Sequence, residues 1–459
     1  MSGGPRASRW LALAALALAL LPAAPPARAD GGTAAPPRAQ ETFDVVWEKL
    51  RGSHFDAGEQ RVDWAALEAT HRPAITGARD LPTLRREINR LLRAVEVSHL
   101  ALIPAGVLPT DRRKPRPSAG QAGVLAELGL RVAVLEGALH VLQVQPGSAA
   151  AQAGIGTGWQ VEAIDDWRLD ETLGGLAAMP EGRDRELARR QLEMHANGRL
   201  DGLAVGEQVS LQLRDGNGQT RQARLAARAA EGTTIRMVPG MPEQTARYNA
   251  RRVVLADGGC ALQVAFDAWA QPAFSGLVGS LREHPDCDRL VLDLRGNPGG
   301  QIWTLTAIAG LLYEQATELG TLETADARLK LAVLPRTVAE DGSRLRTLHG
   351  PVAVLVDGGS ASCSEIFAAA LQATGRARVF GERSAGMALP AMTARLPSGD
   401  WLYFPTADLR APDGRRIEGQ GVLPDEPARA SVADLLAGRD PALEAAFDWL
   451  SQQRPGPAP

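Results

Sequence analysis

Residues 352–366 constrain the fold of this chain more than any other stretch. Val352 to Val356 is an apolar run with the length and β-branched content of a buried strand. Small residues follow, with serines at 360, 362 and 364, and then a strong helix-forming segment at 365–372. A hydroxyl at such a strand-to-helix turn lies beside free N–H groups and the positive end of the helix dipole. The pattern suits the nucleophile of an acyl-transfer enzyme, although helix capping alone would also explain the serines.

A second turn of the same kind precedes it. Leu290 to Leu294 reads as another buried strand, and it runs into Arg295-Gly296-Asn297-Pro298-Gly299-Gly300. Paired glycines after a strand let the backbone approach a ligand closely, with N–H groups directed at it.

The two turns together, in this order, resemble the motifs of the C-terminal processing peptidase and tricorn-core family of serine peptidases. The first motif spans residues 293–300, the second residues 359–365, and the family's closing motif matches residues 417–425. The resemblance covers most of the chain after residue 40. It implies that Ser362 is the nucleophile and Ser364 the helix cap. It also implies oxyanion donors from the N–H of Cys363 and from the Gly299-Gly300 turn.

The catalytic base distinguishes two branches of that family. The branch that uses lysine carries it where this chain has Met387, and the three lysines, Lys49, Lys114 and Lys330, lie outside the motifs. The tricorn-like branch uses a histidine within a Ser-His pair from an N-terminal helical region, which matches Ser98-His99. The resemblance therefore implies His99 as the base and Glu418 as the acid that orients it. A Cys-His enzyme built on Cys363 is the competing interpretation.

The N-terminus has the features of a secretory signal peptide. Arg6 and Arg9 precede a short apolar segment, and Ala27-Arg28-Ala29 suits cleavage near Asp30. The signal peptide predicts an exported bacterial protein of the periplasm or the outside. No later apolar segment is long enough to span a membrane. Cys260 and Cys287 precede two expected strands. If those strands are parallel neighbours, a disulfide between the two cysteines would fit an oxidising compartment.

Composition excludes several classes of function. A net charge of −3 with dispersed basic residues gives no nucleic-acid surface, and the histidines and cysteines lack metal-ligand spacing. No metal or cofactor is therefore expected. A chain of 459 residues is too long for one core and predicts several domains.

Turns and prolines suggest where those domains begin and end. We expect a signal peptide at 1–29, a leader and N-terminal helical domain with His99 at 30–104, a linker at 105–120, a β domain at 121–230, a core at 231–450 and a disordered tail at 451–459. The β domain resembles a PDZ domain, in which the Leu128-Gly129-Leu130 loop would bind the C-terminal carboxylate of a peptide. A generic small β domain is the alternative.

The core alternates strands and helices, with strands expected at 252–255, 261–266, 289–294, 352–356 and 377–380. This predicts an α/β (α+β) fold, which the family resemblance specifies as a crotonase/ClpP-like spiral of ββα units. The function predicted is an exported serine endopeptidase that uses Ser362, His99 and Glu418 on protein or peptide substrates. A catalytically silent PDZ-containing binding protein, and an esterase or acyl transferase with the same triad, remain alternatives.

Overall fold

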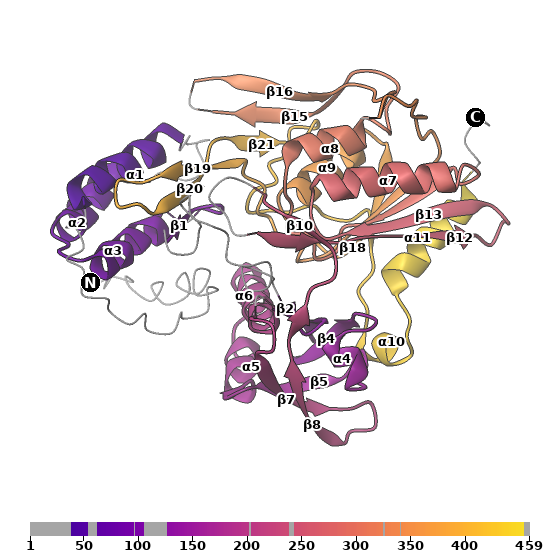
Figure 1. The fold of residues 1–459 in the computed structure, drawn as a ribbon, viewed down its shortest axis with the longest axis horizontal. Helices are drawn as coiled ribbons and strands as arrows, with labels where there is room; N and C mark the ends of the chain where they lie inside the picture. Colours follow the sequence, from indigo (N-terminus) through magenta and orange to yellow (C-terminus); the bar gives the residue numbers. More distant parts are fainter. Residues whose placement is uncertain are drawn as a thin grey trace, which may run out of the picture.

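A computed structural model describes residues 38–53, 62–95, 97–104, 126–201, 203–237, 243–324, 326–339 and 341–453. The predicted signal peptide, the whole of the predicted linker at 105–120 and the last six residues lie outside these ranges. Figure 1 shows an N-terminal helical part at one side, a central α/β core, and an inserted β domain below both. No helix among the described residues has the length and apolar character needed to cross a membrane.

The core is built on a sheet in the order β12-β13-β14-β17-β18-β22, parallel except for the antiparallel β12–β13 pair. Its strands are β12 (Tyr248–Val254), β13 (Cys260–Phe266), β14 (Arg289–Asp293), β17 (Val352–Val356), β18 (Ala377–Gly381) and β22 (Glu426–Pro427). All five residues of β17 are buried because the strand is covered on both faces. The α/β fold predicted from the sequence is confirmed.

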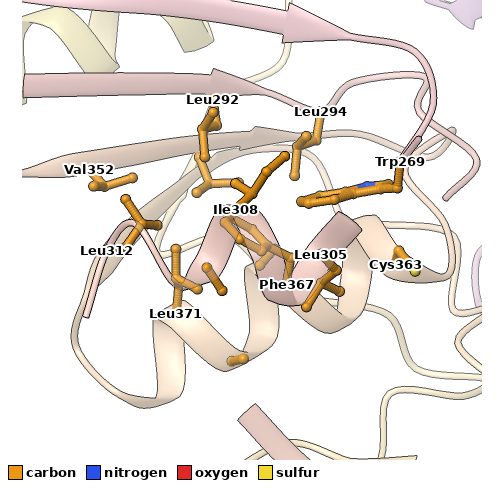
Figure 2. Close-up of a cluster of buried hydrophobic side chains, with 14 of the residues drawn as sticks. Trp269, Leu292, Leu294, Leu305, Ile308, Leu312, Val352, Cys363, Phe367 and Leu371 are labelled. Carbon is orange, nitrogen blue, oxygen red and sulfur yellow. The ribbon is translucent and has the colours of Figure 1, made fainter. Parts of the chain in front are cut away.

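Helices cover both faces of this sheet. One face packs against α7 (Gln271–Glu283), α8 (Ile302–Ala309) and α9 (Cys363–Ala373), and Figure 2 shows Leu305, Ile308, Phe367 and Leu371 meeting the strand residues there. The other face packs against α11 (Pro441–Gln452) through Ala446 and Leu450. Helix α11 continues to Gln452, so the first two residues of the expected tail are helical.

Cys260 and Cys287 form a disulfide between the starts of β13 and β14, with their Cα atoms 4.6 Å apart. The two strands are parallel neighbours, as the sequence argument required. Cys363 is the free, buried cysteine.

The N-terminal helices share a core with a hairpin from the far end of the chain. Helices α1 (Ala39–Ser53), α2 (Trp64–Thr76) and α3 (Leu81–Ala94) pack with β1 (Ala101–Ile103), β19 (Ala391–Arg395) and β20 (Trp401–Pro405). The three strands form an antiparallel sheet in the order β1-β20-β19. Helix α3 and β1 thus bring the Ser98-His99 segment next to the C-terminal half of the chain.

The inserted domain has a hydrophobic core of its own. Its main sheet runs β3-β4-β5-β7-β8, with β6 beside β5 and with β2–β9 as a separate pair. The elements are β2 (Ala126–Glu127), β3 (Leu130–Leu135), β4 (Ala138–Val144), α4 (Ala149–Gln152), β5 (Gln160–Ile164), β6 (Trp167–Arg168), α5 (Asp170–Ala177), α6 (Arg183–Leu200), β7 (Gln208–Arg214), β8 (Thr220–Ala226) and β9 (Arg228–Ala229).

The remaining elements connect or cap these parts. They are the pair β10 (Thr233–Ile235) and β11 (Gln244–Ala246), the sheet β16-β15-β21 made of β15 (Thr317–Glu323), β16 (Arg328–Val333) and β21 (Asp408–Arg410), and α10 (Val432–Leu436). Leu436 of α10 lies against Gly158 and Gly216 of the inserted domain, so this helix joins the domain to the core.

Candidate active site

Ser362 lies at the turn between β17 and α9, as the sequence predicts. It is the N-cap of α9 and has φ 52° and ψ −118°, a conformation that is uncommon outside glycine. Its N–H donates to the carbonyl of Met387 at 2.8 Å and to Glu365 Oε2 at 3.2 Å. The hydroxyl is thus presented at the positive end of a buried helix.

The glycine turn after β14 lies directly against Ser362. A Cβ at Gly299 would come within 2.6 Å of the Ser362 Cβ and 3.0 Å of the Cys363 nitrogen. Gly299 has φ 104°, and its N–H donates to Asn297 Oδ1 at 2.9 Å. Within the described residues, the N–H of Cys363 has no acceptor, whereas Gly300 makes a backbone hydrogen bond to the Cys363 thiol that acts to lower the pKa of the thiol. The N–H of Cys363 is therefore available to an oxyanion, while the N–H groups of Gly299 and Gly300 already have partners.

The other two serines of the turn are structural. Ser360 is buried, accepts the N–H of Asp357 and donates to the Leu294 carbonyl at 2.7 Å. The prediction that Ser364 caps the helix is wrong, because the cap is Ser362. Ser364 is the second residue of α9, where it donates to the Asn297 carbonyl at 3.0 Å and accepts from Trp269 Nε1 at 2.9 Å. It joins the two motif turns to each other.

His99 is connected to Glu418 through Ser98. Ser98 Oγ lies 2.7 Å from His99 Nδ1 and donates to Glu418 Oε2 at 3.0 Å. The N–H of Ser98 also donates to Glu418 Oε1, at 3.3 Å. The direct contact that we expected between His99 and Glu418 is absent, since the serine hydroxyl stands between them. Nor does any hydrogen bond join His99 to Ser362, although both residues are described.

One short segment links the two halves of the site. The Met387 carbonyl accepts the N–H of Ser362, and the N–H of the next residue, Ala388, donates to Glu418 Oε2 at 2.8 Å. Met387 therefore lies beside the nucleophile, at the place where the lysine of the other branch was expected. Lys49 and Lys330 pair with Glu48 and Glu318 on surface elements, and Lys114 lies outside the described residues.

Burial lowers the pKa of His99 to about 4, so the imidazole is neutral at neutral pH. Burial also raises the pKa of Glu418, against the opposing effect of the N–H of Ala388 and of Ser98. The ring of His99 lies 5.8 Å from the ring of Tyr403, whose pKa burial raises to about 12. A neutral imidazole can accept a proton.

Glu365 is a site residue that sequence reasoning did not identify. It is wholly buried, and its carboxylate accepts from Ser384 Oγ at 2.5 Å and from the N–H groups of Gly386 and Met387 at 2.6 and 2.8 Å. Burial raises its pKa to about 7 against these donors, and the neighbouring Glu418 carboxylate acts in the same direction as burial. Its position three residues after an N-cap serine was the available signal, because a capping box has this spacing.

Cys363 is not suited to be the nucleophile. Burial raises the pKa of its thiol to about 12, and its Sγ faces the Gly300 carbonyl at 3.2 Å. A thiol with such a pKa stays protonated, which removes the thiolate that a Cys-His enzyme needs.

The Leu128-Gly129-Leu130 loop belongs to the inserted domain, apart from the Ser362 turn. Leu128 is buried and its carbonyl accepts the N–H of Ala150, while the Gly129 carbonyl accepts the N–H of Gln145. Leu130 begins β3. Among the described residues, one cluster has the donor atoms of a metal site, Cys260, Asp286 and Cys287, and its two sulfurs are joined in the disulfide.

Comparison with known proteins assigns the part of the chain that carries Ser362 and Glu418. Residues 264–428 match Peptidase family S41. By this match the segment is similar to the peptidase domains of family S41. It contains the glycine turn, the Ser362 turn and the Glu418 loop, whereas Ser98, His99 and the inserted domain precede it in sequence.

Relatives and solved structures agree with this assignment. The carboxyl-terminal-processing protease of Picosynechococcus sp. is 32% identical over 170 residues, which are 36% of this chain and 39% of that protein. The chloroplastic carboxyl-terminal-processing peptidase 3 of Arabidopsis thaliana is 27% identical over 65% of this chain and 52% of its own length. The chain thus spans about half or less of these two relatives. The Synechocystis sp. carboxyl-terminal-processing protease is 25% identical over 88% of this chain and 85% of that protein.

The structure of a photosystem II D1 C-terminal processing protease superposes with a TM-score of 0.57 at 20% identity, covering 91% of this chain and 98% of that one. Mature CPAF gives a TM-score of 0.57 at 14% identity, covering 90% and 96% of the two chains. At these identities the two likenesses concern the fold alone.

Proposed function

We propose that this chain is an exported serine endopeptidase in which Ser362 attacks the peptide bond and His99 is the general base. Glu418 would act on His99 through Ser98, whose hydroxyl donates its single proton to the carboxylate and therefore accepts from the Nδ1–H of the imidazole. The observation that carries the proposal is the Ser98 bridge at 2.7 and 3.0 Å between His99 and Glu418. Such a bridge fixes the ring and selects the tautomer, as the acid of a Ser-His-acid triad does.

In the reaction, the Ser362 hydroxyl loses its proton to His99 as the oxygen bonds to the scissile carbonyl carbon. The carbonyl oxygen becomes an oxyanion, which the N–H of Cys363 would bind, together with the N–H of Gly300 once that group turns from the Cys363 thiol to the substrate. His99 then gives the proton to the leaving amine, and water releases the acyl group by the same route. Because His99 makes no hydrogen bond to Ser362 in this peptide-free structure, the ring has to close on the serine when substrate binds, as apo sites often require.

Two further parts of the proposal concern location and substrate. The Cys260–Cys287 disulfide suits an oxidising compartment, which supports the export inferred from residues 1–29. The relatives are named for carboxyl-terminal processing, which supports a substrate engaged near its C-terminus, with the PDZ-like domain as the module that recruits or gates it.

The test is labelling of the chain with a fluorophosphonate probe, which reacts with an activated serine. We expect labelling and peptide cleavage in the wild type, and loss of both by several orders of magnitude in Ser362→Ala. Ser210→Ala, at an exposed serine of β7, is the matched control and should keep the label. The missing His99–Ser362 hydrogen bond favours one second candidate, a silent peptide-binding protein. Equal, negligible labelling of the wild type and Ser362→Ala would support that candidate.

A further inference from the structure

A small cavity lies beside the loop that carries Glu418. Its volume is about 130 Å³, and its walls come from α9, from the segment that follows β18 and from residues 411–423. None of Ser362, His99 and Glu418 lines it, and the Glu418 carboxylate is bound to Ser98 and to the N–H of Ala388. The cavity is therefore separate from the site of the proposed peptidase chemistry.

The charged groups that line the cavity are all cations. They are the side chains of Arg383, Arg415 and Arg416, and no acidic residue belongs to the lining among the described residues. Two of the arginines have acidic partners outside the lining. Arg415 pairs with Asp413 at 2.6 Å, and Arg416 pairs with the fully buried Asp408 at 2.6 Å. The lining is left with an unbalanced positive charge, which favours an anion.

The unbalanced charge belongs to Arg383. Its Nη1 donates to the Gln420 carbonyl at 3.3 Å, and within the described ranges no carboxylate pairs with this arginine. A guanidinium stays charged in proteins and has several N–H donors in a rigid fork that matches a carboxylate. Most of the donors of Arg383 are thus available to an anion that enters the cavity.

The rest of the lining is largely apolar. Ala369, Ala411, Ile417 and Val422 are buried, and Leu423 is half exposed. Phosphate would place oxygens against these carbon atoms without hydrogen bonds, which is unfavourable. A carboxylate on a short aliphatic chain suits both parts of the lining, because the charge meets the guanidinium and the chain meets the apolar wall. A cavity of about 150 Å³ holds benzene, so this one has room for a ligand of similar size.

The walls of the cavity are segments that also position the catalytic groups. Ala369 lies on α9, whose N-cap is Ser362. Arg383 precedes Ser384, and the Ser384 hydroxyl accepts the N–H of Val422 at 2.6 Å, while the N–H of Ser384 donates to the Val422 carbonyl at 3.1 Å. A ligand that contacts Arg383 and Val422 would add a third link between residues 383–384 and the loop that carries Glu418.

We propose that this cavity binds a small, free organic acid with a short branched aliphatic chain. Its carboxylate pairs with Arg383, and its chain packs against Ile417, Val422 and Leu423. The bound acid holds residues 417–423 in place. The proposal goes beyond the peptidase function and does not depend on the Ser362 chemistry.

The test is isothermal titration of the full chain with 3-methylbutanoate at constant ionic strength. We expect a Kd of about 1 mM, the affinity that so small a ligand can reach. Arg383→Gln should raise Kd about tenfold or more, because the carboxylate loses its cation. Arg395→Gln, at an exposed arginine of β19 outside the cavity, is the matched control and should leave Kd unchanged.

Other ligands separate the two parts of the site. The uncharged 3-methylbutanamide, acetate and phosphate should each bind about tenfold more weakly than 3-methylbutanoate or worse. Leu423→Ala should weaken 3-methylbutanoate and leave acetate unchanged, and it keeps the proposal testable if Arg383→Gln does not fold. A hexapeptide that ends in leucine should bind more weakly, because the cavity has no room for its chain. Amide exchange in residues 417–423 should slow with 3-methylbutanoate.

Several results would overturn the proposal. Equal Kd values for the wild type and folded Arg383→Gln would remove the role of Arg383. Equal binding of the amide or of phosphate would remove the assigned ligand class, and tighter binding of the peptide would identify a peptide terminus as the ligand. Absence of any binding of 3-methylbutanoate would remove the site. Fluorophosphonate labelling of the wild-type chain decides the peptidase proposal separately from all of these results.

Discussion

Ser362 has a backbone conformation that costs free energy and that its neighbours maintain. A non-glycine residue at φ 52° is strained by about 1–3 kcal/mol. Its N–H is bound by the Met387 carbonyl and Glu365, and its carbonyl accepts the N–H groups of Glu365 and Ile366. The Glu365 carboxylate also accepts the N–H of Met387. The strain is thus balanced by backbone hydrogen bonds that would break if Ser362 relaxed to an ordinary backbone conformation.

The depressed pKa of His99 makes a prediction about pH. Because the base has to be neutral, kcat/KM for a peptide substrate should rise with increasing pH through about 4, the pKa of buried His99, rather than through the ordinary value of 6.5. The measurement is kcat/KM between pH 3.5 and 8, on the folded protein as judged by circular dichroism. A limb centred between pH 6 and 7 would contradict the prediction for His99. It would instead suit Glu365, whose pKa is about 7.

Among the elements, the glycine turn after β14 and the first turn of α9 form one unit. The side-chain oxygen of Asn297 accepts the N–H of Gly299. The main-chain carbonyl of Asn297 accepts the N–H of Ala361 and the hydroxyl of Ser364 at the start of α9. Trp269 donates to Ser364 Oγ in the first turn of α9, and Figure 2 shows its ring beside Leu294 and above the helices. The position of the N–H groups of Gly300 and Cys363 therefore depends on how closely the turn approaches the helix.

Gly299→Ala should disrupt this unit. The added Cβ would meet Ser362 at 2.6 Å and the Ala361 carbonyl at 2.9 Å, and φ 104° is unfavourable for alanine. We expect a loss of fluorophosphonate labelling of about a hundredfold or more, the scale on which removal of an oxyanion donor acts. Gly279→Ala, in α7 with open space around it, should keep full labelling and gain about 0.5–1 kcal/mol of stability. Normal labelling of Gly299→Ala would show that the close approach is not needed.

The sequence predicted these elements better than the contacts between them. Strands 352–356 and 289–294 and the turns after them were readable, because apolar runs and glycine pairs are local signals. The roles of Ser98 and Ser364 could not be read from the sequence, because each residue makes a hydrogen bond to a segment far away in the chain. Ser98 bonds to Glu418, and Ser364 bonds to Trp269. The same holds for the hairpin of β19 and β20, which packs with the N-terminal helices although it lies some three hundred residues later.

At the scale of the whole molecule, the disulfide closes a loop across the central sheet. It joins residues separated by 27 positions, for which loop-closure entropy gives a stabilisation of about 3 kcal/mol. Urea unfolding of the wild type should therefore shift to lower urea in the presence of dithiothreitol. The double variant Cys260→Ala, Cys287→Ala should unfold at that lower value with or without the reductant. An unchanged midpoint for the reduced wild type would mean that the disulfide does not contribute.

The inserted domain also reaches the Ser362 turn through charge. Arg131 of β3 pairs with Asp357, the residue that follows β17, and Asp357 accepts the N–H groups of Gly296 and Gly359 at 2.8 and 2.9 Å. Burial alone would raise the pKa of Asp357, but Arg131 and these donors hold it below its ordinary value. Arg190 of α6 adds a second contact, with the carbonyls of Ser384 and Ala385 beside Glu365. The domain thus touches both loops that position Ser362.

Arg131→Gln should separate the contribution of this contact from that of the catalytic residues. It would leave the Asp357 carboxylate buried without its cation, which we expect to cost about 3 kcal/mol or more in urea unfolding at pH 7. Without Arg131, burial raises the pKa of Asp357 in the folded variant. The loss should therefore shrink as the pH falls through that pKa, because the buried carboxyl then becomes neutral, and charge burial should cost nothing once the pH is also below the ordinary pKa of the unfolded carboxyl. Labelling of Ser362 should slow, since the turn before it loses an anchor.

Arg221→Gln, which breaks a 3.0 Å pair with Asp215 inside the inserted domain, is the matched control. If both variants lose equal stability and label equally fast, the inserted domain does not support the Ser362 turn through Arg131.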